Sequence, residues 1–258
     1  MIELFASERQ TQILSIINSK GSIKTKDLEK KFNVSKMSIL RDLRTLEEKG
    51  LIERVHGGAI KKEVEGPQEP SFKEKSSKAW QEKEAIAKYA AENYVKDEDI
   101  VSLGAGTTIL RMMPHLKQKN LTILTNGLQN MVYGSKNLQG INIIGSGGSI
   151  RQPALIFVGP IAENFFSQYK VNTTFLSGTG LTIEEGIMDP HPLDVQVKRA
   201  MCKGAKRKIF LIDSSKINNR SLASTIKLNE IDILITDKKT PANIITQLKK
   251  IVPEVIIV

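Results

Sequence analysis

Residues 34–60 read VSKMSILRDLRTLEEKGLIERVHGGAI, and with the segment that begins at Thr25 they decide the fold of the N-terminal part of the chain. Two helical patterns are separated by a turn at Asn33 and Val34. Thr25 and Ser35 are expected to cap the two helices, because a side-chain oxygen can accept hydrogen bonds from the backbone N–H groups that a helix start leaves unpaired. The stretch predicts a helix-turn-helix.

The second helical pattern has a core side and an outward side. Ile39, Leu43 and Leu46 recur at the period of a buried helix stripe. The remaining side chains point away from this stripe, and they include Arg, Ser and Thr with a lysine at the leading end. Such a face suits the major groove of DNA, where Arg can pair with guanine edges or phosphates. The candidate DNA contacts on this helix are Lys36, Met37, Ser38, Arg41, Arg44 and Thr45.

The residues after this helix predict a β-wing. Residues 51–55 and 59–62 are expected as two short strands around a tight turn at residues 56–58. The alternative is an ordinary surface helix and hairpin, since charged faces are usually only solvated. The helix and the wing together favour DNA binding over that alternative. The wing adds Arg54, His56, Gly57 and Gly58 to the candidate DNA contacts.

The composition fits a folded protein with a polyanionic partner. The chain has 258 residues, of which 40% are hydrophobic, and a formal net charge of +10, which favours binding to phosphates. Cys202 is the only cysteine, which excludes an internal disulfide framework and argues against a cysteine-based metal site. No metal or cofactor is expected. The sequence contains no signal-peptide pattern and no bilayer-spanning apolar run, so a cytoplasmic protein is expected.

The chain is expected to contain two domains: a winged helix-turn-helix over residues 1–62 and an α/β domain over residues 80–258, joined by a linker over residues 63–79. The linker segment lacks periodicity and contains Gly66, Pro67 and Pro70. After it, short apolar runs alternate with amphipathic ones, which predicts a mostly parallel sheet with helices on both faces. The fold class is therefore α/β, with a small N-terminal winged domain. Strands are expected at residues 100–103, 121–125, 141–144, 174–177, 209–212, 233–236 and 255–258, and helices at residues 80–94, 107–116, 128–135, 159–168, 193–205 and 241–251.

Polar, glycine-rich tracts follow five of the expected strands. Ligands bind beyond the carboxyl ends of parallel strands, so these tracts are candidate ligand contacts. Each tract alone is also consistent with an ordinary tight turn, whereas five at one edge of a sheet favour a phosphorylated sugar, with Lys216 or Arg151 as counter-charge. The tracts match neither a Walker loop nor a strict dinucleotide fingerprint. The candidate effector contacts are Gly104, Gly106, Thr107, Thr108, Thr125, Asn126, Gly147, Gly148, Arg151, Gly178 and Lys216.

The order S-x-x-S-I-x-R-D-L-x-x-L-E-x-x-G-L-I-x-R-x-H-G-G-A in residues 35–59 resembles the N-terminal winged helix-turn-helix of the DeoR family of bacterial transcriptional regulators. The runs G-T-T, T-N, G-G and D-S-S-K after the expected strands resemble the C-terminal sensor domain of that family. The resemblance implies a fold similar to ribose-5-phosphate isomerase, glucosamine-6-phosphate deaminase and CoA transferases. It also implies sugar-phosphate binding at these runs and adds Lys198, which matches a recurrent family lysine.

Two residues depart from the family pattern. The family usually has Thr-Ile-Arg-Arg-Asp-Leu in the second helix, and Leu40 replaces the first of the two arginines. The family often has Asp-Ser-Gly-Thr-Thr after the first strand of the sensor domain, and Gly104 replaces the aspartate. Leu40 removes a cation from the DNA-binding helix, and Gly104 removes a carboxylate that can hold ligand hydroxyls. The operator and the effector are therefore not carried over from relatives.

The sequence predicts a transcriptional repressor of a carbohydrate-metabolism operon, whose affinity for double-stranded operator DNA is modulated by a phosphorylated sugar. Paired half-sites imply a homodimer or a higher homo-oligomer. One alternative is a sugar-phosphate isomerase or deaminase with an appended DNA-binding domain, and another is a nonspecific architectural DNA binder. The isomerase needs a positioned acid and base, and the candidates form no compact motif, so no catalytic residue is assigned and an enzyme is not expected. Those candidates are Glu185, Asp189, His191, Asp213 and Lys216.

Overall fold

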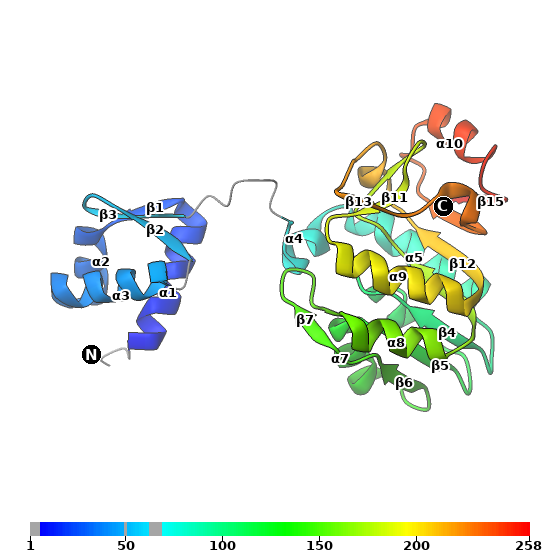
Figure 1. The fold of residues 1–258 in the computed structure, drawn as a ribbon, viewed down its shortest axis with the longest axis horizontal. Helices are drawn as coiled ribbons and strands as arrows, with labels where there is room; N and C mark the ends of the chain where they lie inside the picture. Colours follow the sequence, from blue (N-terminus) through cyan, green and yellow to red (C-terminus); the bar gives the residue numbers. More distant parts are fainter. Residues whose placement is uncertain (1–5, 49–50, 62–68) are drawn as a thin grey trace. The chain divides into compact units, whose positions relative to one another are not determined.

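The helix that carries the outward Arg face forms as α3, Lys36–Glu48, and belongs to the first of two units into which the chain divides. The units are Met1–Gln68 and Glu69–Val258. The computed structural model describes residues 6–48, 51–61 and 69–258, and Figure 1 gives the labels of its elements.

The N-terminal unit is a winged helix-turn-helix. Its helices are α1 (Ala6–Lys20), α2 (Thr25–Phe32) and α3, and its strands are β1 (Ser22–Lys24), β2 (Ile52–Val55) and β3 (Gly58–Lys61). The strands form one antiparallel sheet in the order β1-β3-β2. The wing strands are confirmed, although residue 62 of the expected return strand lies outside the described residues. The core of this unit consists of Ile13, Ile17, Leu28, Ile39, Leu43, Leu46, Ile52 and Ala59.

The two helix starts differ from each other. Ser35 caps α3 as expected, since its Oγ accepts from the backbone N–H of Ser38 at 3.3 Å. The expected cap at Thr25 is wrong, because Thr25 is already inside α2 and its N–H donates to the carbonyl of Gly57 at 2.9 Å. The wing therefore supplies an acceptor for the first N–H group of α2, and no side chain caps this helix. Asn33 ends α2 in the left-handed conformation, with φ 51°, and makes the expected turn.

A buried carboxylate joins α1 to α3. Asp42 is 2% exposed, and its two oxygens accept from Arg9 Nε at 2.6 Å and from Gln10 Nε2 at 3.0 Å. A buried carboxylate needs such partners to offset the loss of water. The aspartate of the Arg-Asp-Leu motif therefore orients the outward face of α3 from inside the unit.

The second unit is built on a seven-stranded sheet in which every pairing is parallel, so the expected α/β fold is confirmed. The strand order is β15-β14-β12-β9-β4-β5-β6. The strands are β4 (Ile100–Leu103), β5 (Thr122–Thr125), β6 (Asn142–Gly145), β9 (Val171–Leu176), β12 (Ala205–Leu211), β14 (Ile233–Thr236) and β15 (Glu254–Ile257).

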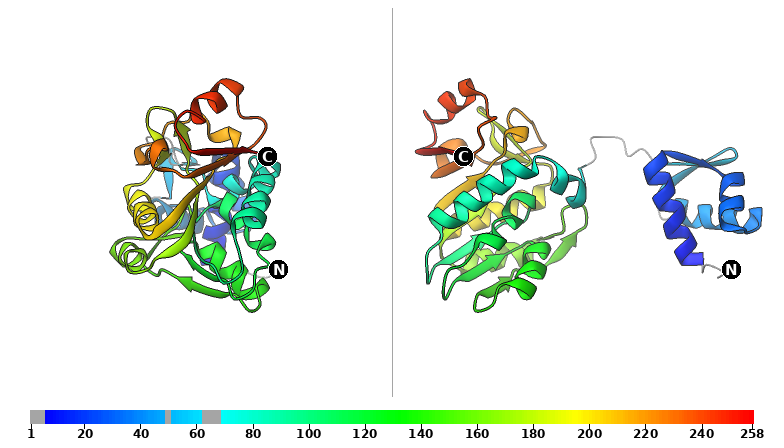
Figure 2. Two further views of the ribbon diagram at one scale, coloured as in Figure 1. Left: turned by 90° about the vertical axis from the view of Figure 1, so that its right-hand side faces the viewer. Right: turned by 180° about the vertical axis from the view of Figure 1, so that it is seen from behind.

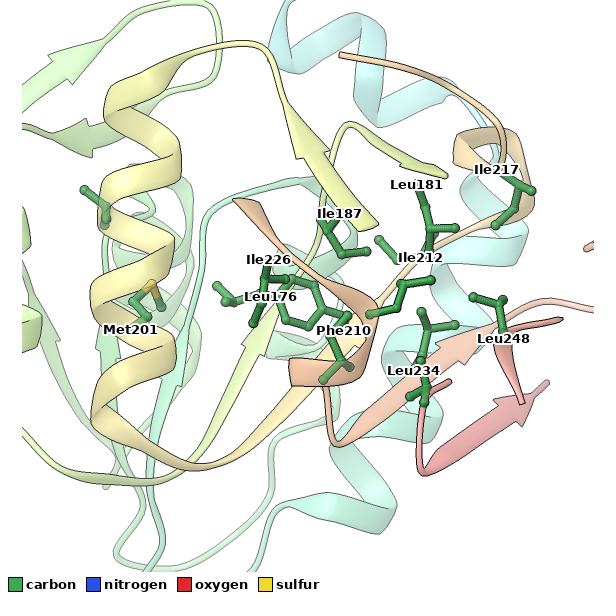
Figure 3. Packing of buried hydrophobic residues seen from close by; sticks show 14 of the residues in the cluster. Leu176, Leu181, Ile187, Met201, Phe210, Ile212, Ile217, Ile226, Leu234 and Leu248 are labelled. Atoms are coloured by element: carbon green, nitrogen blue, oxygen red, sulfur yellow. The ribbon is translucent and has the colours of Figure 1, made fainter. Parts of the chain in front are cut away.

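Helices cover both faces of this sheet. Helices α8 (Pro160–Gln168) and α9 (Pro192–Gly204) lie side by side on one face, whereas α5 (Trp80–Tyr94) covers the other (Figures 1 and 2). Alternate strand residues serve the two faces, so Phe210 packs with α9 and Ile209 packs with α5. Figure 3 shows Phe210 among its neighbours, beside α9. The other helices are α6 (Thr107–Leu110), α7 (Leu128–Asn137) and α10 (Ala242–Leu248).

Three features of this unit differ from expectation. The helix expected over residues 107–116 stops at Leu110 and resumes as a 3-10 turn at Met113–His115, because Pro114 has no N–H to continue an α-helix. Five short antiparallel strands were not expected: β7 (Ser149–Arg151) pairs with β8 (Ile156–Val158), and β10 (Gly180–Thr182), β11 (Gly186–Asp189) and β13 (Ala223–Ile226) form a small sheet. The third is a short helix, α4 (Phe72–Ser77), within the segment expected as a linker.

Replacing Asp42 with alanine is expected to lower the free energy of unfolding of the N-terminal unit by about 3 kcal/mol, because it removes the acceptor of two buried hydrogen bonds. Amide hydrogen exchange of α1 and α3 in the full chain measures this loss. Glu47→Ala is the control, since its exposed ion pair with Arg54, at 3.5 Å, contributes less than about 1 kcal/mol. Equal exchange rates in the two variants would contradict a structural role for Asp42.

Candidate functional site

The outward face of α3 presents most of the side chains expected to contact DNA. Lys36, Arg41 and Arg44 are exposed, and Met37 is 67% exposed. The hydroxyls on this face are partly engaged: Ser38 Oγ lies 3.1 Å from Ser35 Oγ, and the Thr45 hydroxyl donates to the carbonyl of Arg41 at 3.1 Å. The arginines and the lysine are therefore the side chains of α3 best placed to reach a polyanion.

The wing and the start of α2 border a concave surface beside α3. Arg54, His56 and Lys36 line it, together with Lys24 and Lys26, which the sequence reasoning missed. Leu40 also lies on this surface, where the family pattern has an arginine. The missed lysines flank a helix start, which is the signal that could have identified them. Their place beside the candidate contacts extends the basic surface of α3 toward the wing.

The wing glycines have different surroundings. Gly57 is exposed at the turn with φ 80°. Gly58 is buried, and a Cβ added there would lie 2.3 Å from the carbonyl oxygen of Ile23. Gly58 is therefore required for the close pairing of β3 with β1, because a side chain at this position would collide with the backbone of Ile23.

A cavity of about 260 Å³ lies in the second unit, at the carboxyl ends of the central strands. The strand order reverses between β4 and β9, since β5 and β6 extend to one side and β12, β14 and β15 to the other. The loops after β4 and β9 diverge at such a point and leave room for a ligand. Residues 105–107 after β4 and residues 177–179 after β9 both line the cavity.

The structure brings together half of the candidate effector contacts. Gly106, with φ 134°, adopts a backbone conformation that other residues rarely reach, and it opens the loop onto the cavity. Asn126 shapes the same loop, because its Oδ1 accepts from the N–H of Ala105 at 3.0 Å. The candidates that line the cavity are Gly106, Thr107, Asn126, Gly178, Lys198 and Lys216.

The remaining candidates, Gly104, Thr108, Thr125, Gly147, Gly148 and Arg151, do not line the cavity. Thr125 Oγ1 donates to the carbonyl of Leu103 at 2.7 Å and also accepts from Asn130, so it supports the loop from behind. Gly147 and Gly148 follow β6, which is an edge strand and therefore lies away from the reversal point. A Cβ at Gly104 would lie 2.6 Å from Leu176 Cδ2, so the aspartate of the family pattern requires Leu176 to move.

Two lysines on the cavity wall meet at one serine. Lys198 Nζ donates to the Ser177 carbonyl at 2.7 Å and to Asp189 Oδ2 at 2.6 Å. Lys216 Nζ donates to Ser177 Oγ at 2.6 Å and lies 3.5 Å from Asp213 Oδ2. Burial lowers the pKa of Lys216, and the nearby Asp213 carboxylate opposes that effect. Ser177 therefore holds two ammonium groups at the end of β9.

Lys83 is a third cavity lysine, and the sequence reasoning missed it. Its side chain is buried at 3% exposure, and Nζ donates to the carbonyl of Lys75 at 2.5 Å. Burial and the positive charge of Lys216 lower the pKa of Lys83 to about 8. Lys83 lies on the same side of α5 as Ile86 and Ala90, and a lysine within an apolar stripe is the signal that could have revealed it.

Arg151 is held by two carboxylates. Its guanidinium pairs with Asp194, by Nε to Oδ1 at 2.9 Å and by Nη2 to Oδ2, and also with both oxygens of Glu69. Burial tends to raise the pKa of Glu69, but hydrogen bonds from Arg151 and Lys75 outweigh it and lower that pKa. Burial prevails at Asp194 and raises its pKa. The charge of Arg151 is thus neutralised by carboxylates of the protein itself. Arg151 is therefore not placed to be the counter-charge for a ligand that the sequence predicts.

The candidate acids and bases do not assemble into one constellation. Asp189 lines the cavity, but it accepts from Lys198, from Thr225 Oγ1 at 2.7 Å and from Thr179. His191 caps α9, where its Nδ1 accepts from the backbone N–H of Leu193 at 3.3 Å. Glu185 pairs at an exposed position with Lys227. Asp213 is buried and accepts from Ser215, and Lys216 faces Ser177.

Several other features bear on function. Within residues 6–48, 51–61 and 69–258, no group of three or more His, Cys, Asp and Glu side chains is arranged to hold a metal ion. In the same described part of the chain, no helix has the length and apolar character needed to cross a membrane. Cys202 packs against the core below α9, where burial raises the pKa of its thiol to about 12. The thiolate form of this partly buried cysteine is therefore disfavoured.

A winged helix-turn-helix followed by an α/β unit with a ligand-sized cavity defines a DNA-binding transcriptional regulator with a sensor domain. Two family models match the chain: the DeoR-like helix-turn-helix domain over residues 9–64 and the DeoR C terminal sensor domain over residues 78–238. The chain belongs to the DeoR family of transcriptional regulators.

Its relatives include proteins named as regulators and repressors. The chain is 32% identical over 237 residues to the HTH-type transcriptional regulator GolR of Listeria innocua, with 92% of each chain covered. It is 31% identical over 233 residues to the lactose phosphotransferase system repressor of Staphylococcus epidermidis, covering 89% of this chain and 91% of the relative. Among solved structures, ribose 5-phosphate isomerase from Plasmodium falciparum is similar at a TM-score of 0.40 and 14% identity, over 54% of each chain.

Arg41→Ala is expected to weaken binding to the DNA upstream of the protein's own gene by roughly 5- to 150-fold, the loss of one arginine contact worth about 1–3 kcal/mol. Binding is measured at one fixed salt concentration, because phosphate contacts are salt-dependent. Lys31→Ala is the control, since Lys31 is an exposed cation of α2 that does not line the concave surface. Unchanged affinity in the Arg41 variant would remove Arg41 from the interface.

Proposed function

We propose that this regulator represses a carbohydrate-metabolism operon and that a phosphorylated sugar in the α/β unit modulates its affinity for operator DNA. The observation that carries the proposal is the cavity at the carboxyl ends of the central strands, where Lys83, Lys198 and Lys216 meet hydroxyl and amide groups. Lysines supply counter-charge for a phosphate, and polar groups suit a polyol. The relatedness to a lactose phosphotransferase system repressor adds support for a sugar-linked operon.

The charge balance of the cavity favours an anionic effector. Lys198 has Asp189 as a close carboxylate partner, and Lys75 has Glu69 at 2.5 Å. Lys83, in contrast, donates to a neutral carbonyl. A phosphate that reaches Lys83 would therefore gain an ammonium partner without breaking an ion pair. The cavity volume, about 260 Å³, lies just below the usual range of ligand pockets, which begins at about 300 Å³, and favours a small metabolite.

Both the DNA contacts and the assembly state belong to this proposal. The DNA contacts are Lys36, Met37, Ser38, Arg41, Arg44, Thr45, Arg54, His56, Gly57 and Gly58. We expect at least a homodimer on paired half-sites, because helix-turn-helix units usually bind DNA in pairs. Bacterial operators lie in the cytoplasm, so we place the protein there.

We propose that the α/β unit senses its ligand without converting it. Of the five candidate acids and bases, only Asp189 and Lys216 line the cavity. The carboxylate of Asp189 accepts four hydrogen bonds, which leaves it poorly disposed to take a proton from a substrate. Incubating the purified protein with ribose 5-phosphate or glucosamine 6-phosphate tests this directly, and turnover of either compound would favour the isomerase or deaminase alternative.

The operator affinity of the full chain is expected to change by roughly 5- to 150-fold when a matching sugar phosphate is added, the range of a coupling free energy of about 1–3 kcal/mol. Lys83→Met should abolish this response and the binding of the sugar phosphate, because it removes an ammonium group from the cavity. Lys88→Met, an exposed substitution on the same helix, is the control. A panel of sugar phosphates without any effect on a specific DNA complex would contradict the two-site mechanism.

The binding of a sugar phosphate is expected to weaken as the pH rises through about 8, by up to about tenfold per pH unit, the limit for one linked proton. The reason is that Lys83, whose pKa is lowered to about 8, loses its charge in this range, whereas a phosphate with a second pKa near 6 is already a dianion. A bound phosphate raises the pKa of Lys83, so binding takes up protons. Calorimetry in buffers of different ionisation enthalpy measures this uptake, and Lys88→Met, which keeps Lys83, should show the same uptake as the native protein.

A further inference from the structure

One wall of the cavity is formed by a segment that lies outside both family matches. The helix-turn-helix match ends at residue 64 and the sensor match begins at residue 78. Between them, Glu69, Pro70, Phe72 and Lys75 line the cavity, and residues 72–77 form α4. We name residues 69–77 the α4 segment. Because Glu69 is the first residue of the α/β unit, the α4 segment is also the part of that unit nearest in sequence to the winged unit.

The α4 segment is attached to the cavity at both of its ends. At its start, Glu69 pairs with Arg151, and the N–H of Phe72 donates to the carbonyl of Pro153 at 2.8 Å. At its end, the carbonyl of Lys75 accepts from Lys83 Nζ at 2.5 Å and from Thr107 Oγ1 at 3.5 Å. The adjacent carbonyl of Ser76 accepts from Arg111 Nη2 at 3.4 Å.

These attachments are polar, and apolar burial adds little to them. None of the residues of α4 is buried. The helix is stabilised locally by a capping box, in which Ser71 Oγ accepts from the N–H of Glu74 at 3.3 Å and the Glu74 carboxylate accepts from the N–H of Ser71 at 2.7 Å. Segments with few buried apolar contacts open at low free-energy cost. The α4 segment can therefore leave the cavity wall without unfolding the unit.

The groups that hold the end of α4 are the same groups that a ligand anion needs. Lys83 is buried in the cavity and its ammonium is bound to a carbonyl of α4, while the Thr107 hydroxyl points to that same carbonyl. A phosphate oxygen is a stronger acceptor for an ammonium than a neutral carbonyl. A phosphate bound to Lys83 pulls the ammonium and the Thr107 hydroxyl toward itself and so weakens both of their bonds to the Lys75 carbonyl.

We propose that the α4 segment is a strap that competes with the effector: the phosphate takes Lys83 and Thr107 from the carbonyl of Lys75, and α4 leaves the cavity wall. The proposal rests on the proposed function, since it requires an anionic effector in this cavity. Where the Glu69–Arg151 pair opens together with α4, the first anchored residue of the α/β unit moves from Glu69 to α5, which begins at Trp80. The ligand thereby alters the connection to the winged unit.

Hydrogen exchange of the full chain, with inorganic phosphate as the probe, tests the strap. Saturating phosphate is expected to speed amide exchange in residues 72–77 several-fold while the strands of the sheet are unaffected. Ser71→Ala breaks the capping box without changing any charge or any residue of the cavity wall. The loss of a helix cap shifts the equilibrium between docked and released α4 by about fivefold. This variant should therefore bind phosphate up to about fivefold more tightly.

Ser167→Ala is the matched control, since Ser167 makes a local bond to a carbonyl within α8, at 2.7 Å to Asn164, and lies outside the cavity. It should leave phosphate affinity and the exchange of α4 unchanged. If calorimetry detects phosphate binding while exchange in α4 is unchanged or slower, or if Ser71→Ala weakens phosphate binding, the strap is overturned and the effector site stands. If neither inorganic phosphate nor any sugar phosphate binds the native protein, the effector site itself is overturned and the strap with it.

Discussion

Two central strands, β4 and β9, lie side by side in the sheet of the α/β unit, and the chain continues from them in opposite directions. The backbone N–H of Gly104 donates to the Phe175 carbonyl at 2.9 Å, so the two strands stay paired up to the point where their loops separate. The cavity beyond this point is lined by side chains from helices on both faces of the sheet: Lys83 from α5 and Lys198 from α9. The cavity and its charge depend on this one reversal of strand order.

The charged groups around the cavity fall into two sets. In the first, Arg151 is surrounded by Glu69 and Asp194, and Lys198 is paired with Asp189, so these charges are balanced inside the protein. In the second set, Lys83 donates to the Lys75 carbonyl. Lys216 donates to Ser177 Oγ, and the Asp213 carboxylate lies 3.5 Å from its ammonium group. Burial disfavours the charged form of both lysines and lowers their pKa values, and at Lys216 the Asp213 carboxylate opposes that effect. In the proposed function, an anionic effector is therefore stabilised most by Lys83 and Lys216.

The sequence was sufficient to predict the elements whose signal is local. The seven parallel strands are short apolar runs, and α3 has a regular stripe at Ile39, Leu43 and Leu46, so both could be read from neighbouring residues. The five short antiparallel strands could not, because their pairing depends on distant partners, as Ile187 with Ile226. The sequence predicts Arg151 or Lys216 as a counter-charge, and it does not reveal the partners of Arg151 because Glu69 and Asp194 are 82 and 43 residues away. The role of each predicted DNA and effector contact stays a prediction.

The attachment of Glu69 also sets the length of a tether. In the proposed dimer, once one winged unit is bound, its twin is confined near the second half-site by the chain that joins it to the α/β unit. This confinement acts as an effective concentration, which falls roughly as the −3/2 power of the tether length. The α/β end of this connection is fixed at Glu69 while the Glu69–Arg151 pair holds, and it shifts to α5, which begins at Trp80, where that pair opens and α4 is released. Under the proposed mechanism, release of α4 lowers the effective concentration of the second winged unit at its half-site, so operator occupancy falls although the contacts with DNA are unchanged.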